Sequence, residues 1–319
     1  MSSSSDMSKC AASSSNSGMN EEAPEISSNK KVSTSCDQKV ESCNRNNDGV
    51  DHNTSSNIDV SDSLGRVDIS NDGDDKMSIS DEKLFAAPPP KEDCPICFLP
   101  MPHADGICGV GKTYMPCCGK LLCEGCSIAE DDEMVKGNIK AWCSLRRLPL
   151  PKSNEEYIKR LKKRMQLNDA RALGVMGRDY QYGKSGLPKN LNKAFELLKK
   201  SADLGSPMAH YDLAYAYLNG EGIEGDDEEK AFHHWKLAAI GGHEIARYYL
   251  GVLEKNAPVA MKHHMIAARS GYDASLKMVG EGYKAGLVTK DEYANTLRAY
   301  QLSVDEMKSR ERDIAAAQR

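Results

Sequence analysis

Cysteines are the residues of this chain whose spacing is best suited to chemistry. Eight of the 11 cysteines lie between Cys94 and Cys143. The pairs Cys94/Cys97 and Cys123/Cys126 each have the C-x-x-C spacing, which can place two thiolates on one tetrahedral ion. Zn²⁺ with four sulfur ligands is the expected product when two such knuckles meet. We therefore predict a first zinc site made by these four cysteines.

The other cysteines of this stretch predict a second, incomplete site. Cys117, Cys118 and Cys143 can supply three thiolates. Cys108 and His103 are candidates for a fourth ligand, although no spacing in the sequence requires either of them. We expect one bound zinc ion and leave open whether a second one binds.

The compartment expected from the sequence favours metal binding by these cysteines over disulfide formation. Residues Met1–Met19 are rich in Ser and lack the apolar core of a secretory signal. No stretch approaches the roughly 18 uninterrupted apolar residues of a membrane helix. We expect a cytoplasmic or nuclear protein without a membrane partner, in which clustered thiols stay reduced and available to a metal.

Composition sets the N-terminal part of the chain apart. Residues 1–90 hold 21 serines, 16 acidic and 8 basic residues and a single aromatic, Phe85. Their net charge of −8 contrasts with +3 for the rest of the chain, within a total of −5. Such a segment has too little apolar content to offset the entropy of ordering. We predict a disordered Ser/Asp-rich tail over 1–90, with Ser61, Ser63, Ser78 and Ser80 as candidate phosphate acceptors and Cys10, Cys36 and Cys43 as free thiols.

A basic helix is expected over 151–167, between the cysteines and the rest of the chain. Ser153 and Glu156 have the spacing of a capping box, which predicts a helix beginning near Asn154. Eight basic residues between Arg146 and Arg164 could contact nucleic acid or form a solvated helix face. We favour the solvated face, because aromatic residues are not interleaved and the net charge of residues 91–319 is small.

Internal repeats occupy the chain from about residue 168. Ala172, Lys193-Ala194 and Gly205 recur 37 residues later, and Ser201-Ala202 is matched there by Ala238-Ala239. A third unit follows with a shortened loop, and a fourth keeps Gly280 in register and then diverges. Each unit is predicted to be a helical hairpin that must stack on its neighbours to bury its apolar face. The predicted fold is therefore mainly α: an α-solenoid over 168–302, followed by a charged, fraying helix end over 303–319.

No catalytic site emerges from the other polar residues. His234 and His263 share one repeat position with Leu197, and His264 shares the next position with Leu198 and Trp235, so the pairs His233-His234 and His263-His264 are expected to pack and not to bind a metal. No nucleophile with its base is apparent, and we expect no small-molecule substrate.

Residues 91–150 resemble the RING finger family in the order of their cysteines. In that family, ligand pairs one and three hold one zinc ion, and pairs two and four hold the other. The resemblance assigns Cys94/Cys97 and Cys123/Cys126 to the first site. It places Lys120 where the His of pair two should be, and Arg146 where the last Cys should be. Neither side chain can ligate, because both offer only donors.

The resemblance implies binding of a ubiquitin-conjugating enzyme, with zinc in a structural role. Ile96 matches the apolar contact residue of the first knuckle, Leu145 matches a contact near the last ligand, and Arg147 matches the basic residue that steadies ubiquitin. The displaced ligand at Arg146 argues against an intact partner surface.

The repeats resemble Sel1-like repeats, relatives of the tetratricopeptide class, in their A-x3-L-G start, G-x-G loop, K-A, A-A and closing Gly. That family forms α-solenoids that act as adaptors. A RING-like segment before Sel1-like repeats resembles an architecture of diatoms and related algae, over about residues 91–300. Two functions follow: a zinc-binding adaptor whose repeats bind a protein partner, which we favour, or a RING-type ubiquitin ligase whose repeats select the substrate.

Overall fold

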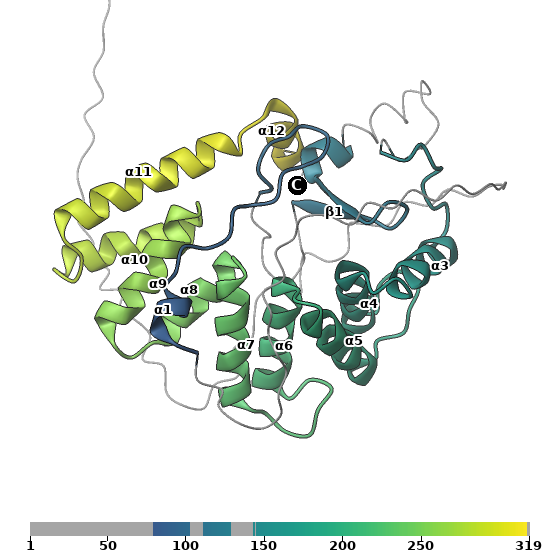
Figure 1. Ribbon diagram of the computed structural model, residues 1–319, viewed down its shortest axis with the longest axis horizontal. Coiled ribbons are helices and arrows are strands. Elements are labelled where there is room, and N and C mark those ends of the chain that lie inside the picture. Colours follow the sequence, from purple (N-terminus) through teal and green to yellow (C-terminus); the bar gives the residue numbers. More distant parts are fainter. Residues whose placement is uncertain (1–78, 103–110, 129–142, 144, 318–319) are drawn as a thin grey trace, which may run out of the picture. The chain divides into compact units, whose positions relative to one another are not determined.

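A computed structural model describes residues 79–102, 111–128, 143 and 145–317 (Figure 1). The predicted disorder of residues 1–78 lies outside these residues, as do His103, Cys108 and the thiols of Cys10, Cys36 and Cys43. None of the described helices is both long and apolar enough to cross a membrane.

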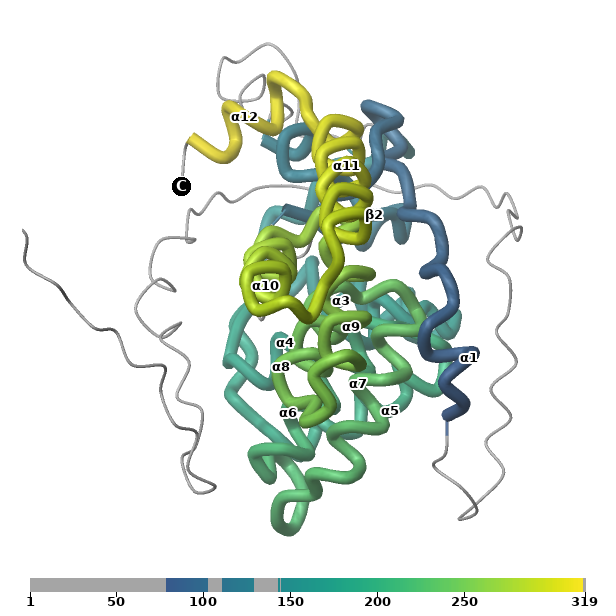
Figure 2. The backbone as a smooth tube through the Cα atoms, turned by 90° about the vertical axis from the view of Figure 1, so that its left-hand side faces the viewer, coloured from purple at the N-terminus to yellow at the C-terminus, as the bar shows by residue number. Residues whose placement is uncertain are grey.

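The described chain is mainly helical, with one small β-hairpin near the cysteines. Its elements are α1 (Asp81–Leu84), β1 (Lys112–Met115), β2 (Lys120–Cys123), α3 (Asn154–Met165), α4 (Ala170–Tyr182), α5 (Leu191–Asp203), α6 (Pro207–Asn219), α7 (Glu228–Ile240), α8 (Glu244–Leu253), α9 (Ala257–Arg269), α10 (Asp273–Lys284), α11 (Lys290–Glu306) and α12 (Arg310–Ala317). The helices α4 to α9 form three hairpins, which confirms the predicted repeat of helical pairs (Figures 1 and 2).

Capping residues recur with the repeat. Asp169, Asn190, Ser206 and Asp227 each accept backbone N–H bonds at the start of α4, α5, α6 and α7. The first helices of units one and two end at glycines in the left-handed region, with φ of 66° at Gly183 and 65° at Gly220. The polar starts and glycine loops of the sequence therefore mark real helix boundaries.

Small residues let the helices of a hairpin approach closely. A Cβ on Gly177 of α4 would lie 3.0 Å from Leu198 Cγ of α5. The Ser201 hydroxyl, fully buried on α5, donates to the Ala170 carbonyl at 2.6 Å. In the next unit, the large buried residues Tyr211 and Trp235 fill the space between α6, α7 and α8.

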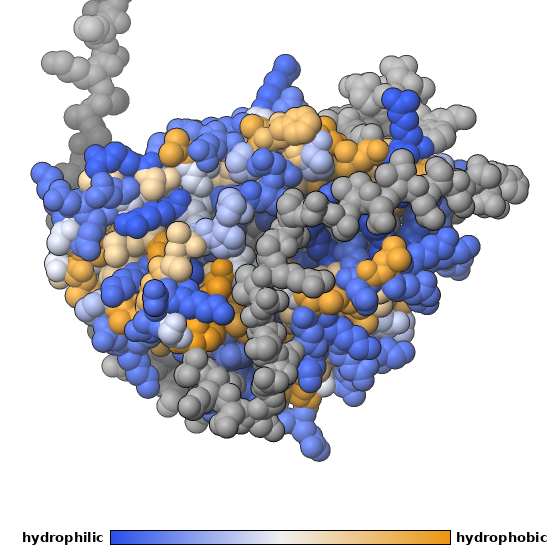
Figure 3. Space-filling view, viewed as in Figure 1, coloured by the Kyte–Doolittle hydropathy of each residue, from blue (hydrophilic) through white to orange (hydrophobic). Residues whose placement is uncertain are grey.

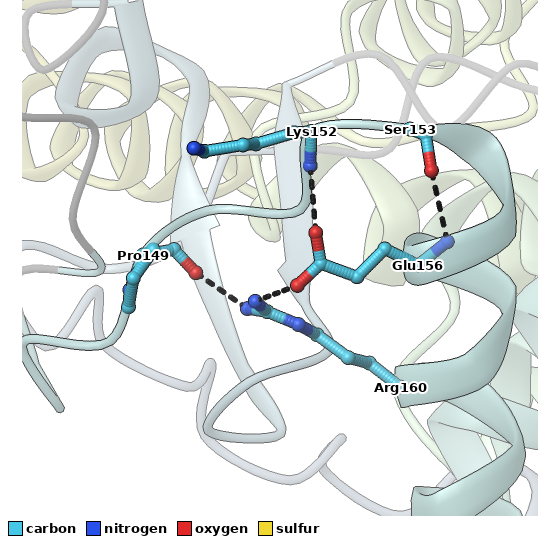
Figure 4. Close-up of polar contacts among 5 residues, drawn as sticks. All are labelled: Pro149, Lys152, Ser153, Glu156 and Arg160. Carbon is cyan, nitrogen blue, oxygen red and sulfur yellow. Dashed lines mark hydrogen bonds and ion pairs between the residues drawn. The ribbon is translucent and has the colours of Figure 1, made fainter. Parts of the chain in front are cut away.

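The helix α3 begins at Asn154, as its capping pattern predicts (Figure 4). Ser153 Oγ accepts from the Glu156 N–H at 3.2 Å, but the Glu156 carboxylate accepts from the Lys152 N–H at 3.1 Å and not from that of Ser153. Glu156 also pairs with Arg160, whose guanidinium donates to the Pro149 carbonyl at 2.6 Å. These contacts fix the turn that leads from the cysteine module into the repeats.

The cysteine module is built on the hairpin of β1 and β2. The two strands pair antiparallel, with Lys112 opposite Cys123 and Met115 opposite Lys120. The Tyr114 hydroxyl donates to the Asp169 carboxylate at 2.8 Å, and Glu92 pairs with Arg171. The module is thus joined to the first repeat by polar contacts at the start of α4.

The C-terminal end differs from the expected fraying helix end. The helix α11 stops at Glu306, and a separate helix, α12, follows with Ala315 buried. The Arg312 guanidinium donates to the carbonyls of Pro100 at 2.8 Å and Met307 at 2.7 Å. Arg312, one of the charged residues from which fraying was expected, therefore binds a carbonyl in a distant part of the chain. Composition alone cannot reveal such a contact.

The last residues of the predicted tail also differ from the expectation of disorder. Residues 79–90 are described, and Leu84 is only 5% exposed among residues of α6, α7 and α8. Leu84 and Phe85 stand side by side, and the pair supplies the burial that the rest of the tail lacks. The described part of the chain thus begins within the predicted tail, at Ile79.

Candidate metal centre

Four cysteines meet in the module as the spacing predicts. The Sγ atoms of Cys94, Cys97, Cys123 and Cys126 all lie within 4.8 Å of one another. Cys94 and Cys97 stand in the loop before β1, Cys123 is the last residue of β2, and Cys126 lies in the helical residues 124–128. Three of the four are buried and Cys97 is half-buried, so the group is a shielded cluster of thiols.

Backbone N–H groups favour negative charge on one sulfur of this cluster, that of Cys94, whereas burial raises the pKa of Cys123 and Cys126. Burial alone would raise the pKa of Cys94, but N–H groups of Cys123, Cys97 and Ile96 point at its sulfur and lower the pKa to about 7. The Cys123 N–H donates to Cys94 Sγ at 3.5 Å. Because the thiolate is the form that binds a metal, these donors favour a ligand set that a tetrahedral ion such as Zn²⁺ fits.

A second group joins the three remaining cysteines that the structure describes. The Sγ atoms of Cys117, Cys118 and Cys143 also lie within 4.8 Å of one another. Hydrogen bonds from the thiols of Cys117 and Cys118 lower the pKa of Cys143, whereas the contacts of Cys117 with Cys118 and Cys143 raise the pKa of Cys117. The three sulfurs therefore form an incomplete ligand set.

The backbone around Cys143 repeats the loop around Cys94. In the first loop, the Cys94 N–H donates to the Leu99 carbonyl at 2.9 Å and the Phe98 N–H to the Cys94 carbonyl at 2.8 Å. In the second loop, the Cys143 N–H donates to the Leu148 carbonyl at 2.7 Å and the Arg147 N–H to the Cys143 carbonyl at 2.6 Å. Phe98 and Arg147 share a positive φ, of 56° and 51°. Cys143 and residues 145–148 thus share these backbone features with Cys94 and residues 96–99.

The two residues that replace ligands lie at the surface. Arg146 occupies the place in the second loop that Cys97 has in the first, and its side chain is exposed. Lys120 is exposed at the start of β2. The second group therefore has three sulfurs among the described residues, as the sequence indicates.

The predicted contact residues have different surroundings. Ile96 is half-buried and packs against the cysteines. Leu145 is 38% exposed, and Arg147 is exposed beside it. Only the latter two are freely accessible on the described surface.

One residue of this centre was missed in the sequence. Arg312 of α12 donates to Cys97 Sγ at 3.4 Å and to the Leu99 carbonyl at 3.3 Å. A Cβ on Gly125 would lie 2.7 Å from the Arg312 backbone nitrogen, so α12 lies directly on the module. No short-range signal connects Arg312 with a loop more than 200 residues earlier.

The histidine pairs of the repeats pack as predicted. His263 and His264 are 3% and 1% exposed, and burial lowers their pKa values to about 3 and 4. Among the described residues, the groups that could hold a metal consist of cysteines alone.

Comparisons with known proteins support the repeats. The family model "Sel1 repeat" matches residues 170–206 and 207–243, in the 37-residue register of the sequence. The F-box protein At1g70590 of Arabidopsis thaliana is 31% identical over 111 residues, which are 33% of this chain and 30% of that protein. The match thus spans about a third of either protein.

Two solved structures are similar to the helical part. A Sel1 repeat protein from Oxalobacter formigenes is 27% identical, with a TM-score of 0.36 over 39% of this chain and 97% of that one. The protective antigen c5321 of uropathogenic Escherichia coli, which displays an SLR fold, is 21% identical, with a TM-score of 0.38 over 61% of this chain and 44% of that one. The family model and the observed helices show that the chain contains Sel1 repeats in a mainly helical fold.

Proposed function

We propose that the protein is a zinc-stabilised adaptor, in which the Sel1 repeats bind a protein partner and the cysteine module is a structural or docking element. Proteins with Sel1 repeats typically mediate protein–protein interactions. Zinc in the first cysteine group would hold the loop of Cys94 against β2 and the residues after it.

The contact between α12 and the first knuckle carries this proposal. A RING-type ligase needs the surface of this knuckle for a conjugating enzyme. Here Arg312 holds the carbonyls of Leu99 and Pro100, and α12 covers Gly125. A module that is fixed by the chain's own last helix is suited to a structural role.

Counting zinc tests the first half of the proposal. Native mass spectrometry of the full chain should show at least one zinc ion, and Cys94→Ser should lose it. Cys10→Ser is the matched control, because Cys10 lies far outside the module in the sequence. A metal-free wild-type protein prepared with zinc would overturn the zinc role.

Peptide selection tests the second half. A random-peptide display library is selected on the immobilised full chain, and the enriched peptides are mapped by hydrogen exchange. We expect protection in α4 to α9. Protection confined to the cysteine module would contradict an adaptor that works through its repeats.

The ligase alternative has one observation in its favour. Cys143 and residues 145–148 share backbone features with the first knuckle, and Leu145 and Arg147 are exposed to solvent. The direct test is self-ubiquitination with a panel of conjugating enzymes. Transfer that Ile96→Ala abolishes, but that Leu302→Ala on the exposed face of α11 leaves intact, would establish the ligase instead.

A further inference from the structure

The segment Ile79–Lys91 lies along the repeats as a bound peptide would. Leu84 inserts among Tyr211 of α6, Trp235 of α7 and Leu250 of α8, and Ile79 and Phe85 pack beside it. Pro89 follows against Gly242, where a Cβ would come within 3.2 Å of the proline ring. Figure 1 shows this segment at α1 beside α8 and α9, and Figure 3 shows apolar surface in the same area among hydrophilic residues.

A buried arginine holds the main chain of this segment. Arg247 of α8 is 2% exposed. One guanidinium nitrogen donates to the Ala239 carbonyl at 2.9 Å, and the other donates to the Leu84 carbonyl at 2.8 Å. The groove therefore needs a carbonyl acceptor from its occupant, because a buried guanidinium without one is costly.

The aromatic side chain of the segment has its own site. The Phe85 ring lies 4.8 Å from the His263 ring, measured between centroids. Lys262 Nζ lies 5.5 Å from the centre of the Phe85 ring, within reach of a cation–π contact. At the far end, Lys91 Nζ donates to the Ser270 carbonyl at 2.6 Å.

The repeat register shows that this site belongs to unit three. Arg247 is the counterpart of His210, 37 residues earlier, and His263 is the counterpart of His234, 29 residues earlier. In unit two, His210 and His234 contact each other directly, with their Nδ1 atoms 2.9 Å apart. In unit three, the equivalent side chains contact Leu84 and Phe85 of the segment. The same two repeat positions thus contact each other in unit two and the segment in unit three.

We propose that this groove of α6 to α9, which we call the Leu-Phe groove, is the partner site of the adaptor, and that Ile79–Lys91 covers it as an intramolecular ligand. The partner is a protein segment with a short helical turn that ends in Leu and an aromatic residue. This inference rests on the proposed adaptor function and names its site. The partner binds by displacing the chain's own segment.

The test uses the full chain and a labelled synthetic peptide of residues 77–91. In the variant Leu84→Ala/Phe85→Ala, the groove is free, and we expect saturable binding at least tenfold tighter than that of the wild type. Fluorescence anisotropy measures both affinities. The same peptide with both residues changed to alanine should not bind to the freed variant. A difference between the two peptides on one protein cannot come from how well that protein folds.

Surface variants locate the binding. Lys262→Ala in the freed protein should weaken the peptide about two- to fivefold, the scale of an exposed cation–π contact. Lys255→Ala, an exposed lysine before α9, should not. Light scattering should show that the wild-type protein is a monomer. A dimer in which the segments are exchanged between copies would contradict the claim that Ile79–Lys91 binds the groove of its own chain.

Failure of this inference can be told from failure of the adaptor proposal. Equal binding of the alanine peptide, or no binding to a freed variant with wild-type circular dichroism, would overturn the Leu-Phe groove. Display-selected peptides that protect other repeat helices would still support the adaptor.

Discussion

Replacing Arg146 by cysteine should complete the second metal site. The loops Cys94–Leu99 and Cys143–Leu148 share both backbone hydrogen bonds and a positive φ at the same place. Position 146 therefore corresponds to Cys97, and a thiol there is expected to reach the group of Cys117, Cys118 and Cys143. Because the two loops share these hydrogen bonds and the positive φ, the change is expected to require little rearrangement of the backbone.

The size of the effect follows from the number of ligands. Structural zinc sites bind with about 10–16 kcal/mol. An even share among four ligands is about 3 kcal/mol each, which corresponds to a roughly hundredfold change in Kd. We expect Arg146→Cys to tighten binding of the second zinc ion by about that factor.

Competition with a chromophoric chelator under reducing conditions measures this affinity, and native mass spectrometry gives the stoichiometry. Arg147→Cys is the matched control, because Arg147 has the positive φ that corresponds to Phe98 and not to a ligand. An Arg146→Cys protein whose second ion binds no more tightly than in the wild type would refute the equivalence of the two loops. Equal gains in both variants would refute it as well.

Three further changes test the module and the repeats. Removal of metal by a chelator should unfold the cysteine module while far-UV circular dichroism keeps the helix signal of the repeats; collapse of both would contradict separate stabilisation. Gly251→Ala should lower the free energy of unfolding by about 1–3 kcal/mol, because its Cβ would lie 2.7 Å from the ring of His264, which is 1% exposed. Gly280→Ala, whose Cβ would lie 3.9 Å from the nearest atom of Tyr293, should not destabilise the protein, and urea denaturation measures both changes. Burial lowers the pKa of His243 to about 4, so between about pH 6.5 and pH 4 the unfolded chain binds more protons than the folded chain. The free energy of unfolding should therefore fall over this range as the pH is lowered, and His243→Asn should reduce that fall.

Short-range patterns predicted the repeats and the first cysteine group. The C-x-x-C spacings bring Cys94, Cys97, Cys123 and Cys126 together because each pair is held by one local turn. The offset of 37 residues placed the hairpins because every unit repeats its caps, small residues and glycine turn. In both cases, the information lies within a few tens of residues.

Long-range contacts account for what the sequence did not predict. The sequence places Arg312 in a charged end, yet its guanidinium donates to a loop that lies more than 200 residues away. Leu84 and Phe85 were included in a disordered tail, because their composition is visible in the sequence but the groove that receives them is not. Average composition predicts disorder correctly only when no residue of the segment packs against a part of the chain that is distant in the sequence.

The contact of α12 with the first knuckle sets an order of events during synthesis. Cys97 and Arg312 are 215 residues apart. At about 5–20 residues per second, ribosomes need roughly 10–40 seconds to reach Arg312 after Cys97. The cysteines therefore leave the ribosome before α12 does, so the time for loading metal, and for oxidative damage, begins before α12 can contact the module.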